Sequence, residues 1–201
     1  MIMKKQVFLL AVFLIILKSL YAQDYIQVIK SFQQEMNADF SDSIKSPLPK
    51  EDLKTFKNLD FFEIDSTYCI EAQFIRTPFE TPFPMKTTTV RAPMYVKYGE
   101  AIFTFGNINC KLNIYQNLEL IKKEGYQDYL FLPFTDAGNG DESYGGGRYI
   151  DLKIPDKETI RIDFNKAYNP YCAYNHKYSC PIPPVENSLP MAIKAGVKKY
   201  H

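Results

Sequence analysis

The fold is decided most clearly by residues 101–112, AIFTFGNINCKL, in which a Gly-Asn pair separates two runs of alternating apolar residues. A two-residue Gly-Asn turn of type I′ or II′ joins two antiparallel strands in a tight hairpin. The turn also fixes the register, and it predicts three apolar cross-strand pairs: Phe105 with Ile108, Phe103 with Cys110, and Ala101 with Leu112. This stretch therefore predicts an antiparallel sheet with one apolar face.

The rest of the chain has the composition of strands and turns. It contains 15 Tyr, 15 Phe and 13 Pro but no Trp, and aromatic residues favour strands while Pro favours turns. Apolar residues recur at helical spacing only in residues 23–57, where Tyr25, Ile29 and Phe32 share one face. We therefore expect a mainly β, β-rich α+β protein: an antiparallel barrel or sandwich with one or two N-terminal helices.

The first 22 residues have the parts of a secretory signal. Lys4 and Lys5 precede an apolar run of 11 residues, Val7 to Leu17, and Ala22 suits a cleavage site. The run is short for a membrane span, which needs about 20 residues, although an N-terminal anchor is the alternative. We expect residues 1–22 to be a cleavable signal peptide and residues 23–201 to form a single domain. The protein is then exported, to the periplasm or the extracellular space, with no stable membrane span.

Charge argues against a polyanionic partner. Residues 1–22 hold three lysines and no acid, so their removal leaves 21 basic and 23 acidic residues. No basic stripe stands out in this balance, and nucleic acid is not an expected partner.

Residues 148–164 contain two further strand patterns on either side of a short turn. Ile150 and Leu152 share one face of the first pattern, which leaves Tyr149 and Asp151 on the other. If the two strands pair with each other, Asp151 and Asp163 come within about 5 to 8 Å. Two such carboxylates can divide into an acid and a base, but a solvated sheet face with a weak ion pair to Arg161 is the simpler interpretation.

Arg148 falls on the apolar face of the first strand pattern and follows three glycines. A buried arginine requires a carboxylate or several carbonyl groups. We expect it either to anchor the core or to bind an anionic group of a ligand.

Residues 163–190 form a loop rich in Pro, Asn and Tyr, which needs a reason to be ordered. In an oxidising compartment, a disulfide between Cys172 and Cys180 would stabilise it by about 2–3 kcal/mol, although four cysteines permit three pairings. His176 lies midway between them, but a zinc site would need a fourth ligand. We expect no metal and no cofactor.

Several long motifs resemble the domain-of-unknown-function 1684 family of bacteria. They are FLPFTDAGNGDESYGGGRYIDL, RIDFNKAYNPYCAYN, YSCPIPPVENSLP and AIKAGVK, and the resemblance covers nearly all of residues 46–198. The chain departs from the family pattern at Lys166, Ser188 and Val197. The resemblance implies a shared fold and a shared site, and it brings no assigned activity.

Three functional hypotheses follow. The first is a binding module for a small polar molecule or glycan, because tyrosine faces and asparagine amides suit such ligands. The second is a hydrolase-type enzyme with Asp151 and Asp163 as acid and base and Arg148 stabilising negative charge. The third is a structural or assembly protein of the cell envelope. The tyrosines of the loop and the residues carried over from the family together give the expected ligand-binding set: Asp136, Tyr144, Asn165, Tyr168, Asn169, Tyr174 and Asn187.

Overall fold

The structure is a computed structural model that describes residues 23–200; the predicted signal peptide, residues 1–22, and residue 201 lie outside the described part. Residues 23–41 form the N-terminal helix. The other helices and strands are α2 (Lys50–Thr55), β1 (Cys69–Arg76), β2 (Phe83–Pro84), β3 (Met94–Phe105), β4 (Ile108–Asn117), β5 (Tyr129–Asp136), β6 (Arg148–Lys153), β7 (Thr159–Asp163) and β8 (Ser188–Leu189).

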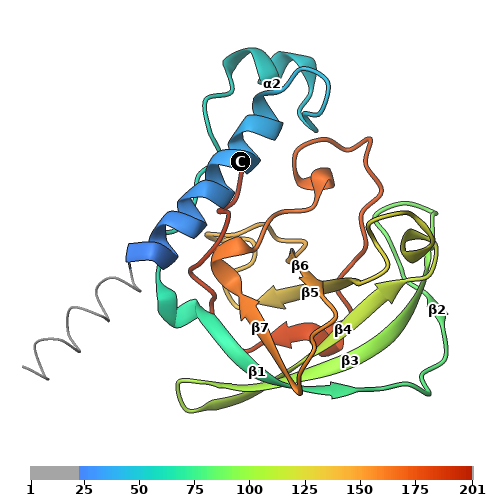
Figure 1. Ribbon diagram of the computed structural model, residues 1–201. Helices are drawn as coiled ribbons and strands as arrows, with labels where there is room; N and C mark the ends of the chain where they lie inside the picture. The colour runs from blue at the N-terminus through green and yellow to red at the C-terminus, as the bar shows by residue number, and fades with distance from the viewer. Residues whose placement is uncertain (1–22, 201) are drawn as a thin grey trace, which may run out of the picture.

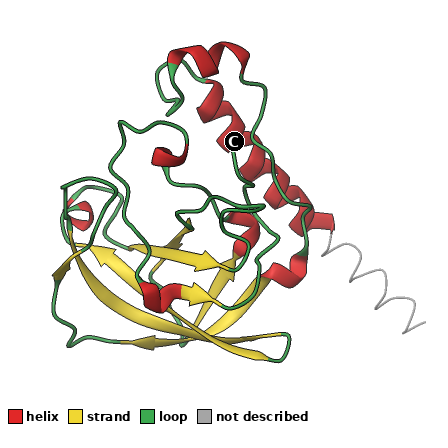
Figure 2. Cartoon of the chain, turned by 180° about the vertical axis from the view of Figure 1, so that it is seen from behind, coloured by secondary structure: helices red, strands yellow, loops and turns green. Residues whose placement is uncertain are grey.

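The strands form one curled, mostly antiparallel sheet in the order β6-β5-β4-β3-β1-β7. Strand β2 pairs with β3, and β8 lies parallel to β5. The sheet makes a half-barrel at one end of the molecule, and the N-terminal helix rises beside it (Figure 1). The view from behind shows the same separation between the strands below and the helices and loops above (Figure 2). The mainly β prediction is confirmed, and the described α-helices lie in the N-terminal part as expected, whereas short 3₁₀ helices also occur later in the chain.

The predicted hairpin is confirmed in every pair. Strands β3 and β4 align Phe105 with Ile108, Phe103 with Cys110, and Ala101 with Leu112. Gly106 adopts a φ of 59°, which the turn requires and which glycine adopts without steric cost.

The pairing considered for the next two strands does not occur. Strands β6 and β7 lie at opposite ends of the sheet. Strand β6 pairs with β5, where Asp151 opposes Phe131, and β7 pairs with β1, where Asp163 opposes Cys69. The short connection joins two strands that diverge, because each finds a more distant partner with a complementary apolar face.

Alternation along the strands gives the sheet two buried faces. The inner face holds the main core, which includes Leu112, Leu132 and Ile162, all 0% exposed. The other face holds a smaller aromatic cluster around Phe131 and Tyr149. A third cluster around Phe40 joins the N-terminal helix to the loop after β7. The second sheet face is the floor of the site described next.

Candidate functional site

The floor of the candidate site consists of side chains on the second face of β5 and β6. Ile150 points into the main core, whereas Tyr149 and Asp151 lie on the opposite face. Phe131 is the Cα partner of Asp151, and Tyr129 lies two residues earlier on the same face. The period of two therefore places three aromatic rings and one carboxylate together.

The free edge of β6 is covered by Tyr168, from the segment after β7. The Tyr149 amide donates to the Tyr168 carbonyl at 2.9 Å, and the Tyr168 amide donates to the Tyr149 carbonyl at 3.0 Å. The two rings stand at 90° with centroids 5.8 Å apart. This isolated bridge fixes the start of the loop on the edge of the sheet.

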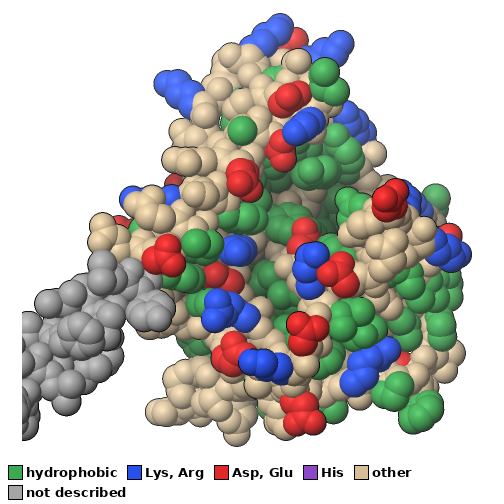
Figure 3. All heavy atoms as spheres, in the orientation of Figure 1, with side chains coloured by type: hydrophobic (Ala, Val, Ile, Leu, Met, Phe, Trp, Pro, Cys, Tyr) green, Lys and Arg blue, Asp and Glu red, His purple; other side chains and the backbone are tan. Residues whose placement is uncertain are grey.

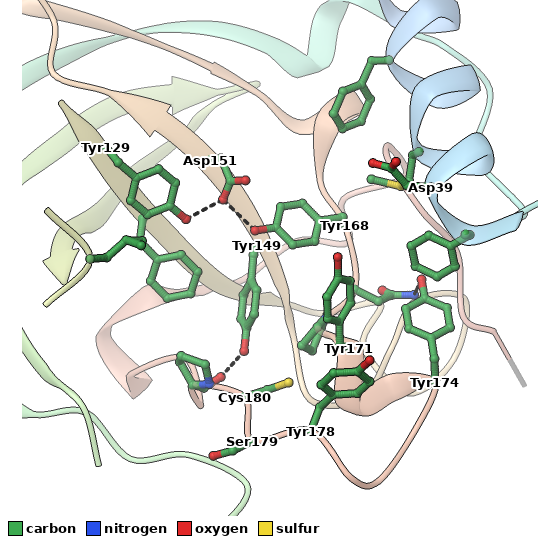
Figure 4. Close-up of a pocket in the computed structure, with 18 of the residues that line it drawn as sticks. Asp39, Tyr129, Tyr149, Asp151, Tyr168, Tyr171, Tyr174, Tyr178, Ser179 and Cys180 are labelled. Atoms are coloured by element: carbon green, nitrogen blue, oxygen red, sulfur yellow. Dashed lines mark hydrogen bonds between the residues drawn. The ribbon is translucent and has the colours of Figure 1, made fainter. Parts of the chain in front are cut away.

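Asp151 accepts hydrogen bonds from two phenols at the same oxygen. Tyr168 donates to Asp151 Oδ1 at 2.6 Å and Tyr129 donates to it at 2.7 Å (Figure 4). Hydrogen bonds to an ionised acceptor are the stronger kind. Within the described part of the chain, Asp151 forms no ion pair, so its negative charge meets only neutral donors.

The loop after Tyr168 forms the second wall. It turns through the 3₁₀ helix η4 (Tyr171–Ala173) and brings Asn169, Tyr174 and Tyr178 to the pocket. The Asn169 amide donates to the Lys198 carbonyl at 2.9 Å and to the Tyr174 hydroxyl at 3.3 Å. These bonds attach the loop to the C-terminal segment, so the tyrosines are held by the fold.

The N-terminal helix supplies the third wall with five residues at helical spacing. The Phe40 ring packs against the Tyr174 ring, with the ring centroids 4.8 Å apart and the ring planes at 73° to each other. This contact anchors the helix to the loop. One face of the helix thereby reaches the pocket with Phe32, Glu35, Met36, Asp39 and Phe40.

These three walls enclose a cavity of about 520 Å³, a volume typical of small-molecule sites. Figure 3 shows this side of the molecule hollowed between the N-terminal helix and the body, with mainly hydrophobic side chains around the hollow. The lining includes three carboxylates, Glu35, Asp39 and Asp151, and no described Lys, Arg or His. It also includes seven tyrosines: Tyr95, Tyr129, Tyr149, Tyr168, Tyr171, Tyr174 and Tyr178.

The phenols of the floor stay protonated at neutral pH. Burial raises the pKa of Tyr129 and Tyr168, and the nearby charge of Asp151 raises both further. Burial also raises the pKa of Tyr149. These groups therefore act as hydrogen-bond donors and acceptors rather than as bases.

Arg148 and Asp136, both predicted site residues, form a buried ion pair outside the pocket. Arg148 Nη2 lies 2.8 Å from Asp136 Oδ2, and both side chains are 0% exposed. The guanidinium also donates to the carbonyls of Ile193 and Ala195. The structure thus places Arg148 as an anchor of the core, which leaves no room for the predicted contact with a ligand or a reacting group.

Asp163 and Asn165 are not among the lining residues of the pocket either. The Tyr25 hydroxyl donates to Asp163 Oδ1 at 2.9 Å, and the Asn165 side-chain amide donates to the same oxygen at 3.1 Å. These contacts join the N-terminal helix to the end of β7. The predicted acid–base pair of Asp151 and Asp163 is therefore not assembled, because the two strands lie at opposite ends of the sheet.

Asn187, another predicted ligand-binding residue, joins strands β4 and β5. Its Oδ1 accepts from the Asn113 amide at 2.8 Å, and its Nδ2 donates to the carbonyls of Asn113 and Pro133 at 2.8 and 2.7 Å. Beside Asn187, strands β4 and β5 share a single pair of aligned residues, Tyr115 with Phe131. The side chain of Asn187 therefore replaces hydrogen bonds that the two backbones do not form with each other.

Tyr144 is not among the lining residues either; its hydroxyl lies 4.0 Å from Cys172 Sγ.

The disulfide expected between Cys172 and Cys180 is not present in the structure, in which all four cysteines are free thiols. The Cys172 amide instead donates to Cys180 Sγ at 3.2 Å. Hydrogen bonding between the two thiols lowers the pKa of Cys172 and raises that of Cys180. Backbone contacts with Thr88 order the loop here, since the Thr88 amide donates to the Cys180 carbonyl at 2.9 Å.

Among the described residues, no group of three His, Cys, Asp or Glu side chains is arranged to hold a metal ion.

The structure thus brings together Asp151, Tyr168, Asn169 and Tyr174 of the predicted residues. Tyr129, Tyr149 and the acidic residues of the helix were not among the predicted site residues. The parity that placed Asp151 also placed Tyr149 on its face, so that signal was available. The helix acids carry no comparable signal, because an exposed acidic face is typical of any amphipathic helix.

Fold and pocket together define a class of protein: a curled β half-barrel with a tyrosine-lined pocket between one sheet face, a C-terminal loop and an N-terminal helix. Residues 54–198 match the family described as "Protein of unknown function (DUF1684)", and the chain belongs to this family. The floor and loop walls lie within the matched range, whereas the helix wall precedes it.

Among solved structures, the chain is similar to the solution NMR structure of the uncharacterised protein from gene locus rrnAC0354 of Haloarcula marismortui. The two share 30% sequence identity with a TM-score of 0.68, over 88% of this chain and 95% of the other. No curated protein matches the chain.

Proposed function

We propose that this protein is an exported binding protein that holds a small polar ligand in the tyrosine-lined pocket. The observation that carries this proposal is the arrangement at Asp151, where two phenols from different elements converge on one carboxylate oxygen. Three residues singled out from the sequence for ligand binding, Tyr168, Asn169 and Tyr174, border the same cavity as Asp151. Tyrosine suits such a site because its ring packs against apolar groups while its hydroxyl bonds to polar ones.

The hydrolase alternative has less support. It needs a second carboxylate near Asp151 and a positive group for the developing charge. Asp163 and Arg148 were the candidates, and both are engaged elsewhere in the fold. The phenols beside Asp151 are not available as bases at neutral pH, because burial raises their pKa and keeps them protonated.

Export rests on the pattern of residues 1–22. None of the described helices is both long and apolar enough to cross a membrane. The proposed location is the periplasm or the extracellular space, and expression of the tagged full chain with fractionation of the cells tests it.

A thermal-shift screen tests the binding proposal. Protein purified after expression of the complete sequence is heated with a panel of sugars, amino acids, nucleosides, carboxylates and amines. A ligand of the folded state raises the Tm by mass action. The expected result is at least one compound whose effect is lost in Asp151→Asn and kept in Asp156→Asn, a matched change at an exposed turn residue outside the pocket. A panel without any such compound would count against the proposal.

A further inference from the structure

The charges that line the pocket are all of one sign. Glu35, Asp39 and Asp151 border it, and none of its described lining residues is basic. Asp39 is 3.0 Å from Lys45, which neutralises part of its charge. Glu35 and Asp151 form no ion pair within the described residues. The cavity therefore carries uncompensated negative charge, and a cation would be drawn into it.

The apolar part of the lining is mainly aromatic, and neighbouring rings are set at several angles to one another. The Tyr149 and Tyr168 rings are perpendicular, and those of Tyr171 and Tyr178 are inclined at 59° with centroids 5.2 Å apart. The face of an aromatic ring carries partial negative charge and attracts an ammonium group. Rings at different angles around one space form the kind of cage that surrounds such a group.

The polar atoms of the floor offer acceptors rather than donors. Tyr129 and Tyr168 both use their hydroxyl hydrogens on Asp151 Oδ1, so their oxygens and the second carboxylate oxygen remain as acceptors. An anionic ligand would meet unfavourable charge from these groups, whereas the N–H groups of an amine match them.

We propose that the pocket binds an organic cation, with its ammonium group against the tyrosine faces and beside Asp151. This inference rests on the proposed binding function and names the chemical class of its ligand. Glu35 and Asp39 at the helix wall contribute attraction at longer range. The volume of about 520 Å³ leaves room for a body larger than the ammonium group itself.

Calorimetric titration with matched pairs of compounds tests the inference. One pair is choline and its uncharged isostere, in which a tert-butyl group replaces the trimethylammonium group. The other is cadaverine and pentanediol. The titrations are made in about 0.15 M salt, which screens attraction to exposed charges. We expect the charged member of at least one pair to bind about tenfold or more tightly than the neutral member.

Variants locate the effect. Asp151→Asn keeps an acceptor for the two phenols, and Tyr171→Leu removes a ring that is 45% exposed and so tolerant of change. Each should weaken the binding of the charged compound by about tenfold, while Asp156→Asn should leave it unchanged. Charged compounds that bind equally well to Asp151→Asn and Tyr171→Leu would overturn the inference.

Two other outcomes separate this inference from the function on which it rests. If the neutral members bind as tightly as the charged ones and this binding depends on Asp151, the ligand is not specifically a cation, and the proposed binding function still holds. If neither choline nor cadaverine binds, the proposal of a cationic ligand is also contradicted. The thermal-shift screen then decides whether a sugar, nucleoside or carboxylate occupies the pocket or whether the binding function fails as well.

Discussion

The hydroxyl of Tyr168 and the carboxylate of Asp151 are joined by a hydrogen bond of 2.6 Å, although the two residues lie on different elements. Tyr168 belongs to the loop after β7, whereas Asp151 lies on strand β6. The backbone bridge between Tyr149 and Tyr168 sets this geometry before any ligand is present. The pocket is therefore part of the folded architecture, and binding does not have to order it.

The alkaline stability of the protein should report the phenols of the pocket. Burial raises the pKa of Tyr129, Tyr149 and Tyr168 above the ordinary value of 10.0. Below that value both the folded and the unfolded state keep the protons, and stability does not change. Above it the unfolded state loses them first, so the free energy of unfolding falls by about 1.4 kcal/mol per pH unit for each phenol.

Urea denaturation at a series of alkaline pH values measures this slope. In the Tyr168→Phe variant, the free energy of unfolding should fall less steeply with pH, by about 1.4 kcal/mol per pH unit. An identical slope in this variant would show that the Tyr168 phenol ionises as freely in the folded protein as in the unfolded chain.

Arg148→Met should destabilise the protein by about 3–5 kcal/mol, because it leaves Asp136 buried without its partner. Urea denaturation of the ligand-free protein measures the change. The control is Arg161→Met, whose side chain is 74% exposed and lies 3.9 Å from Glu71; this change should cost less than about 1 kcal/mol. A folded Arg148→Met variant of nearly native stability would contradict the structural role assigned to the ion pair.

Asn187→Ala should cost about 3 kcal/mol or more, since it leaves the amide and carbonyl of Asn113 and the carbonyl of Pro133 without this partner. The matched control is Asn109→Ala in the exposed part of the β3–β4 hairpin, where a change within about 0.5 kcal/mol is expected. Equal costs for the two variants would mean that Asn187 does not hold β4 and β5 together.

Local patterns in the sequence predicted the parts of the fold that depend on neighbouring residues. The Gly-Asn turn fixed the β3–β4 register, and the period of two assigned Ile150 to the core and Asp151 to the other face. The same parity placed Arg148 on the apolar face, where it is buried as expected. These are properties of turn geometry and side-chain alternation, which act over a few residues.

Long-range pairing was not accessible in the same way. A short turn between 153 and 159 is compatible with a hairpin, and only the competing edges of β5 and β1 decide against it. The carboxylate of Asp163 consequently bonds to Tyr25, 138 residues away in sequence. The predicted disulfide failed for a related reason: the contacts with Thr88 order the loop without one.

An NMR titration of protein with labelled tyrosine rings, using any compound that raises the Tm in the screen, tests whether the ligand occupies the tyrosine-lined pocket. The ring signals of Tyr129, Tyr168 and Tyr171, which line the pocket, should shift with one common Kd. The ring signal of Tyr98, which lies outside it, should not shift. Shifts at Tyr98, in the separate hollow beside Arg76, with unchanged signals from Tyr168 would contradict the assignment of the pocket.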